Sequence, residues 1–185
     1  PYGDPHNIIE NVFAHNCAGC GVLIVNIRDT YLNRVVSNYN YYGFSSSGYD
    51  AVFQDCFAAY SRKAGFNVES RYNIFVRCSA DRNGASVTDD DVGFSVAGSR
   101  CILISCISEH SKTHGMKVSG SGHRILYCHI LDNSVHQEAQ GDGIRLVDAM
   151  ECIVEGNEIF DTVTPSHHQD YAIKETGSSD SNKIR

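Results

Sequence analysis

The sequence has no tryptophan, only three prolines and only two methionines among its 185 residues. Basic residues are also few, because 15 Lys and Arg face 22 Asp and Glu and leave a net charge of −7. That balance argues against a non-specific nucleic-acid binder, so we expect no nucleic-acid partner. No apolar run approaches the ~18–20 residues of a membrane span, so we expect no membrane partner. The chain begins with Pro1 and not with methionine, and we interpret it as a processed or excised piece.

Glycine and aromatic residues are abundant, with 16 Gly, 10 Tyr and 8 Phe. Together with the scarcity of proline they favour short strands separated by tight turns. Six glycines recur at spacings of 22, 22, 28, 22 and 28 residues, and after most of them the first and third residues are apolar. These anchor glycines are Gly21, Gly43, Gly65, Gly93, Gly115 and Gly143. A seventh, degraded unit is expected 28 residues further on, at residues 170–174.

A unit of 22 residues with two or three short strands cannot bury its apolar face alone, but stacked units bury a continuous core. We therefore predict an all-β fold, a right-handed parallel β-helix of about seven coils of 22–28 residues. The chain is expected to be a single β-helix domain over residues 1–185, and a piece of a longer β-helix. One inward column of side chains is predicted to contain Phe44, Phe66, Phe94, Met116 and Ile144.

Four of the eight cysteines follow the same repeat, since Cys56, Cys78, Cys106 and Cys128 are separated by 22, 28 and 22 residues. Each of them ends an apolar or alternating run. Because free cysteine is among the most buried residue types, we predict a reduced ladder of thiols inside the rod and no disulfides among them.

These repeats resemble the coils of the pectin-lyase-like superfamily, which holds polysaccharide lyases, glycosidases, sugar epimerases and phage tailspikes. Segments such as IIENVFAHNCAGCGVLIVN are similar to the repeats of alginate (mannuronan) epimerases. The resemblance covers nearly the whole chain and implies a polysaccharide partner. We expect an extracellular or virion-surface location.

The first residues, Tyr2-Gly3-Asp4-Pro5-His6, resemble the Tyr-Gly-x-Asp-Pro-His catalytic stretch of alginate epimerases and are one residue shorter. The resemblance implies that Tyr2, Asp4 and His6 serve a proton transfer. The next coil presents Leu23 and Val25 outward, which is a poor place for a second acid.

Chemistry on a β-helix is expected on outward positions and inserted loops, because inward side chains form the core. The outward column two residues past each anchor is predicted to contain Leu23, Ser45, Asn67, Ser95, Lys117, Arg145 and Ile173. Three insertions, at 85–92, 135–142 and 164–170, lengthen the same turn and flank the part of this column that holds Lys117 and Arg145. We therefore place the site on the outward face of coils four to six.

Within this region His114 is the expected proton-transfer residue, and Asp142 is its partner or a second acid. Asp91 completes the catalytic group. The expected substrate-binding residues are Lys117, Arg145, Glu69, His136 and His168.

Three functions remain open at this point. A lyase or epimerase acting on an acidic polysaccharide would neutralise the uronate carboxylate with Arg145 or Lys117. A hydrolase would use two of Asp91, Asp142 and Asp170. The alternatives are a non-catalytic phage tailspike or appendage shaft that binds cell-surface glycan, which could be a homotrimer, and a purely structural spacer. No cofactor is required, although residues 89–91 form a run of aspartates that could bind Ca²⁺.

Overall fold

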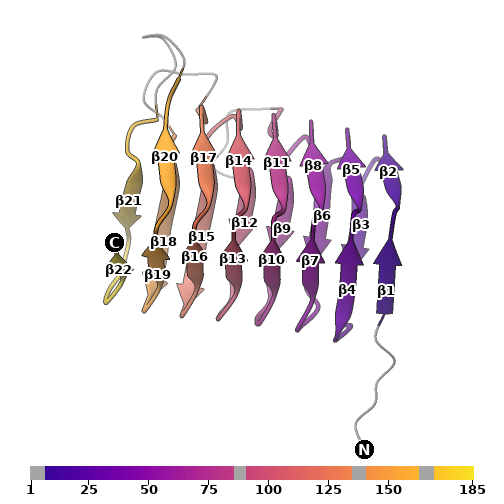
Figure 1. Cartoon of the computed structure of the whole chain (residues 1–185), viewed down its shortest axis with the longest axis horizontal. Helices are drawn as coiled ribbons and strands as arrows, with labels where there is room; N and C mark the ends of the chain where they lie inside the picture. The colour runs from indigo at the N-terminus through magenta and orange to yellow at the C-terminus, as the bar shows by residue number, and fades with distance from the viewer. Residues whose placement is uncertain (1–6, 86–90, 135–140, 163–168) are drawn as a thin grey trace, which may run out of the picture.

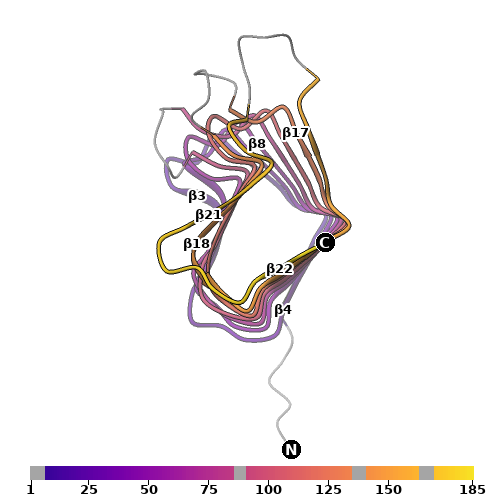
Figure 2. The same ribbon diagram turned by 90° about the vertical axis from the view of Figure 1, so that its left-hand side faces the viewer.

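The computed structural model describes residues 7–85, 91–134, 141–162 and 169–185. The chain winds through three parallel sheets, and each coil adds one strand to every sheet, which confirms the predicted β-helix (Figure 1). Seen along the rod, the coils superimpose as one outline with three sides (Figure 2). Within these residues no helix has the length and apolarity needed to cross a membrane.

The strands of each sheet follow one another at intervals of three in chain order. Sheet 1 contains β1 (Asn7–Glu10), β4 (Thr30–Asn33), β7 (Val52–Gln54), β10 (Ile74–Val76), β13 (Ile102–Ile104), β16 (Arg124–Leu126), β19 (Ile153–Glu155) and β22 (Lys183–Ile184). Sheet 2 contains β2 (Phe13–His15), β5 (Val36–Asn38), β8 (Phe57–Ala59), β11 (Ser79–Asp81), β14 (Ile107–Glu109), β17 (His129–Leu131) and β20 (Glu158–Phe160). Sheet 3 contains β3 (Cys20–Ile24), β6 (Tyr42–Ser46), β9 (Phe66–Val68), β12 (Phe94–Val96), β15 (Met116–Ser121), β18 (Ile144–Met150) and β21 (Ile173–Thr176).

The predicted inward column is confirmed, because its five members pair in register along sheet 3 and none is more than 1% exposed. The rings of Phe44 and Phe66 stack with centroids 4.7 Å apart, and Phe66 stacks on Phe94 at the same distance. Phe53 and Phe75 from sheet 1 meet this stack edge-on. Aromatic packing of this kind is more favourable than area burial alone.

The anchor glycines face the backbone of the next coil. A Cβ atom on Gly43 would lie 2.4 Å from the carbonyl oxygen of Gly65, and one on Gly115 would lie 2.7 Å from that of Gly143. No side chain fits at such an approach, which explains why glycine recurs at this position.

The predicted register is wrong by one residue in the last coil. Ile144 pairs with Ile173 and Arg145 with Lys174, so the final spacing is 29 residues and not 28. The anchor position there is Ala172, whose carbonyl oxygen faces Gly143. The outward column therefore ends at Lys174, and Ile173 is an inward-column position.

Two-residue corners between sheets 1 and 2 produce the thiol ladder. The first corner residue has a positive φ, as at Asp55 and Arg77, and the second carries the inward cysteine. Cys56, Cys78, Cys106 and Cys128 are buried and free, which confirms the predicted reduced ladder. Burial raises the pKa of the Cys78 thiol well above its usual range.

Asparagines satisfy the backbone at the other corners by reaching back to the preceding coil. Asn83 accepts the Ser61 amide proton at 3.0 Å and donates to the Ala58 carbonyl at 3.2 Å. Between sheets 3 and 1 the same role belongs to Asn73 and Asn182, but His123 takes it in between. Each of these bonds pairs a buried group that would otherwise have to be desolvated without a partner.

His123 imitates an asparagine in this ladder. Its Nδ1 accepts the Cys101 amide proton at 3.2 Å, so its proton is on Nε2, which lies 3.0 Å from the Ser119 carbonyl oxygen. The side chain is buried, and this burial lowers the pKa of the imidazole.

The titration of His123 is expected to weaken the fold in mild acid. In the unfolded chain the imidazole takes a proton near its ordinary pKa of about 6.5, whereas in the folded chain the pKa is lower. Stability is therefore full above pH about 6.5 and falls as the pH is lowered towards the folded pKa. His123→Asn keeps the ladder contacts and removes the titration. Thermal unfolding at pH 7.5 and 5.5 is expected to show a smaller loss for this variant, and equal losses would contradict the assignment.

Candidate functional site

The outward side chains of sheet 3 form a continuous polar column across six coils. Its members pair strand by strand, and Lys117 lies beside both Ser95 and Arg145. We call this set the outer column, and it consists of Ser45, Asn67, Ser95, Lys117, Arg145 and Lys174. At about 4.8 Å between strands, its last three members place three positive charges along roughly 10 Å of the rod.

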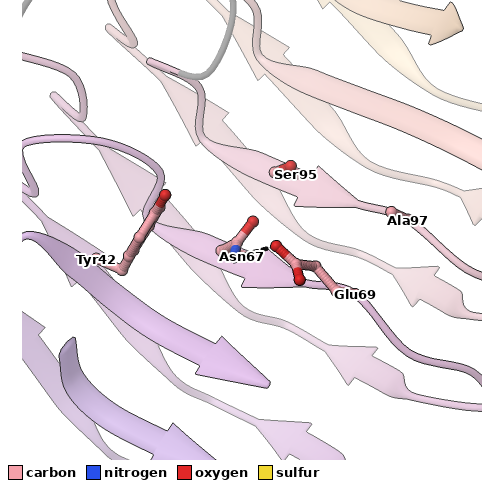
Figure 3. Close-up of a pocket in the computed structure, with 5 residues that line it drawn as sticks. All are labelled: Tyr42, Asn67, Glu69, Ser95 and Ala97. Carbon is pink, nitrogen blue, oxygen red and sulfur yellow. Dashed lines mark hydrogen bonds between the residues drawn. The ribbon is translucent and has the colours of Figure 1, made fainter. Parts of the chain in front are cut away.

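A pocket of about 410 Å³ adjoins the basic half of the column. It is lined by Tyr42, Asn67, Glu69, Ser95 and Ala97, with Tyr42 projecting from the neighbouring strand (Figure 3). The Asn67 amide donates to the Glu69 carboxylate at 3.2 Å. Hydroxyl, amide and carboxylate groups thus converge on one hollow, and Ser95 connects it to Lys117. The predicted binding residue Glu69 lies in this pocket.

The carboxylates near the basic half of the column are few and distinct. Asp170 Oδ2 lies 3.2 Å from Lys174 Nζ, whose ammonium also lies 4.5 Å from the centroid of the Tyr171 ring. Asp142 Oδ2 lies 4.0 Å from Arg145 Nε. The Arg145 side chain is 24% exposed, so its guanidinium borders the surface from a position over buried groups.

His114 and Asp142 do not lie on the outward face, contrary to the prediction. Their side chains are 0% and 2% exposed. The physical reason is the alternation of the strand, because His114 and Asp142 lie two residues before the inward-facing Met116 and Ile144 and therefore share their side. Burial raises the pKa of the Asp142 carboxyl, while the nearby Lys174 and Arg145 charges oppose this rise.

The ring nitrogens of His114 are both in close contact with their surroundings. Nδ1 accepts the backbone N–H of Asp142 at 2.8 Å, so the neutral ring has its proton on Nε2. Nε2 lies 3.0 Å from Arg145 Nη1, which can only donate. The single lone pair of the neutral ring is thus directed at the backbone, and His114 supports Arg145 from the interior. Its expected role in proton transfer stays a prediction.

Asp91 is also buried and not outward, again contrary to the prediction. Its Oδ1 lies 3.3 Å from Lys63 Nζ, and its backbone carbonyl accepts the Thr113 hydroxyl at 3.1 Å. Asp91 therefore belongs to the wall that joins coils three, four and five, and the surface of sheet 3 gains no carboxylate from it.

Several predicted residues lie outside the described part of the chain. They are Tyr2, Asp4, His6, His136 and His168, together with Asp89 and Asp90 of the expected Ca²⁺ run. Their roles stay predictions. The segments 86–90, 135–140 and 163–168 all fall in connections from sheet 2 to sheet 3, as the equal insertions imply.

Two members of the site were missed from the sequence. Tyr42 precedes its anchor glycine and was not distinguished from other outward-column neighbours, although it projects into the pocket. Lys174 was missed because the seventh unit was placed one residue too early. The pairing of Lys117 with Arg145 was a usable signal, since a third basic residue at a spacing of 29 continues it.

One group in the described residues has the composition of a metal site. Ligand atoms of Asp81, Glu109 and His110 all lie within 4.8 Å of one another on the outer side of sheet 2. However, Arg82 Nη1 lies 2.8 Å from Asp81 Oδ2, and His110 Nδ1 lies 3.2 Å from Oδ1. Arginine thus supplies the counter-charge that a cation would otherwise provide, and the group requires no metal.

Comparison with known proteins agrees with this architecture. Residues 2–185 match the family described as "Right handed beta helix region". The A-module of mannuronan C-5 epimerase AlgE4 from Azotobacter vinelandii superimposes with a TM-score of 0.74 at 17% identity, covering 96% of this chain and 53% of that one. The AlgE6 A-module from the same organism gives 0.62 at 16% identity, covering 96% and 59%. This chain thus spans little more than half of either module. No curated protein matches it in sequence.

Proposed function

The chain belongs to the right-handed β-helix family, and on that basis we propose that it acts on an acidic polysaccharide held along the outer face of sheet 3. The observation that supports this most directly is the outer column, where a polar pocket continues into three aligned basic side chains. A uronan has one carboxylate on every sugar unit, and a row of cations at strand spacing suits such a repeating anion. The likeness to the epimerase modules supports the same substrate class.

Within this proposal Arg145 and Lys117 neutralise a uronate carboxylate. Neutralisation stabilises the anion that forms when a proton leaves the carbon beside the carboxylate, which is the step that lyases and epimerases share. Arg145 can engage both carboxylate oxygens because its guanidinium is planar, and His114 with Asp142 supports it from below. The pocket adds two groups able to exchange protons, the Tyr42 phenol and the Glu69 carboxylate.

The burial of Asp91 and Asp142 decides against the hydrolase alternative built on that pair. A glycosidase needs two carboxyl groups that both reach the sugar, and these two side chains are closed off from solvent. Epimerase or lyase chemistry on a uronan therefore has the better support, and the glycan-binding shaft is the second candidate.

The test uses polymannuronate and the purified chain. The double variant Lys117→Ala/Arg145→Ala is expected to bind it about 10- to 100-fold more weakly in titration calorimetry, because each charge-assisted hydrogen bond contributes about 1.5–3 kcal/mol. The control Arg34→Ala/Lys183→Ala removes two exposed charges remote from sheet 3 and is expected to bind like the parent. Equal affinity of both double variants would contradict the proposal.

Turnover separates the two candidate functions. In D₂O an epimerase introduces deuterium beside the carboxylate, and a lyase produces an unsaturated end that absorbs in the ultraviolet. Binding without either product, by a chain that is trimeric in solution, would favour the glycan-binding shaft. Binding with product, lost in Tyr42→Phe or Glu69→Gln, would assign proton transfer to the pocket.

A further inference from the structure

A second hollow lies around the corner from the pocket, where sheet 3 turns into sheet 1. It has a volume of about 310 Å³ and is lined by Tyr49, Glu69, Ser70, Arg71, Gly98 and Ser99. Glu69 borders both this hollow and the pocket on sheet 3. Ala97 of the pocket is followed directly by Gly98 of the hollow. The two depressions therefore follow one another along the same pair of coils.

Arg71 is fixed in this hollow by aromatic rings. Its guanidinium carbon lies 5.1 Å from the centroid of the Tyr49 ring and 5.9 Å from that of Tyr72. Arg28 flanks Tyr49 at 5.8 Å, and Arg100 flanks Tyr72 at the same distance. Cation–π contacts of this kind orient a planar guanidinium without using its N–H donors.

The charge of Arg71 has no carboxylate partner within 4.0 Å in the described part of the chain. The arginines that form ion pairs there behave differently, since Arg77 is bound by Asp55 at 2.8 Å and Arg82 by Asp81 at the same distance. Arg71 is exposed, and its donors remain available to a ligand from solution.

The absence of a side chain at Gly98 keeps the hollow open. A Cβ atom there would lie 2.3 Å from the Ser70 carbonyl oxygen, and φ is +107°. Glycine is therefore required, and the backbone of Gly98 and Ser99 forms a bare floor opposite Arg71. Arg71 pairs with Ser99 across this floor.

We propose that this corner is a second anion subsite, in which Arg71 binds one carboxylate of the polysaccharide beyond the units held by the outer column. The inference rests on the proposed function, because the ligand is the same chain of uronate units. Arg71 lies four residues after Asn67, which is at most about 13 Å along the coil. A chain that occupies the pocket and extends past Glu69 and Ala97 reaches it, whereas a short oligomer held at Lys117 and Arg145 does not.

The experiment measures how affinity depends on ligand length. Mannuronate oligomers from the disaccharide to the octasaccharide are titrated against the parent, Arg71→Ala, Arg71→Lys and the control Arg34→Ala, with thermal unfolding to verify the fold of each variant. Arg71→Ala is expected to leave the affinity for the shortest bound oligomer unchanged and to weaken the longest by about 10-fold. Arg71→Lys is expected to recover only part of this loss, because lysine cannot bind bidentately.

Two results would overturn the subsite. One is equal affinity of Arg71→Ala and the parent at every length, and the other is a loss that is the same for short and long oligomers. Failure of the proposed function is recognised separately. If the parent binds no mannuronate oligomer, or if Lys117→Ala/Arg145→Ala binds as tightly as the parent, the substrate class itself is wrong and the subsite falls with it.

Discussion

Phe66→Ala is expected to lower the free energy of unfolding by about 3–5 kcal/mol, the usual cost of emptying a buried phenylalanine site. Phe66 lies at the centre of the aromatic core, stacked between Phe44 and Phe94 and met edge-on by Phe53 and Phe75. The rigid coils on both sides cannot close the cavity, because the strand ladders hold their spacing. For a chain of this size the melting temperature is expected to fall by roughly 6–20 °C.

Phe13→Ala provides the matched control for this substitution. Phe13 is 64% exposed and packs on one side against the His15 ring, so its removal opens no cavity. Calorimetric or denaturant unfolding of the three proteins is the measurement. A loss for Phe66→Ala no greater than that for Phe13→Ala would mean that the stacked rings do not hold the coils together.

Gly120→Ala is expected to destabilise the fold by about 3 kcal/mol or more. Gly120 has a φ of +98°, and a Cβ atom there would lie 1.9 Å from the carbonyl oxygen of Gly98 in the preceding coil. Both the backbone angle and the contact must change, and backbone cannot move aside as the end of a side chain can. The position also adjoins the irregularity between Ser119 and Gly120, where the pairing of β15 with β18 shifts.

Gly19→Ala is the control for Gly120→Ala. No heavy atom lies within 4 Å of a Cβ atom placed on Gly19, and its φ is not in the region that favours glycine. The expected change in unfolding free energy is within about 0.5 kcal/mol. Similar losses for the two variants would contradict the idea that close backbone approach at Gly120 fixes the coil spacing.

The coil register was predictable because the inward residues and the anchor glycines obey a physical requirement that repeats in every coil. Phe66 must fill the same space as Phe44 and Phe94, and Gly65 must admit the next backbone, so spacing alone places them. The last coil escaped this argument, because Ala172 replaces the anchor glycine and removes the signal.

The site was predictable only in part, since its residues meet no such repeated requirement. Lys117 and Arg145 were found because strand alternation directs both outward. His114 and Asp142 were placed on the wrong side because their polar character outweighed that same alternation, although a buried imidazole can be satisfied by backbone contacts. The arrangement of Tyr49, Arg71 and Tyr72 depends on side-chain directions at a corner, which spacing does not encode.

The close approach of successive anchor glycines also limits how such a protein can change its length. Gly43 faces the carbonyl of Gly65, and Gly115 faces that of Gly143, so a coil fits only when it is complete. An insertion of one or two residues inside a strand would move every later glycine away from its neighbour. A duplicated or deleted repeat, by contrast, restores all of these contacts at once, like a turn added to a spring. Growth by whole turns is therefore the route open to this rod, and smaller additions are confined to connections such as those from sheet 2 to sheet 3.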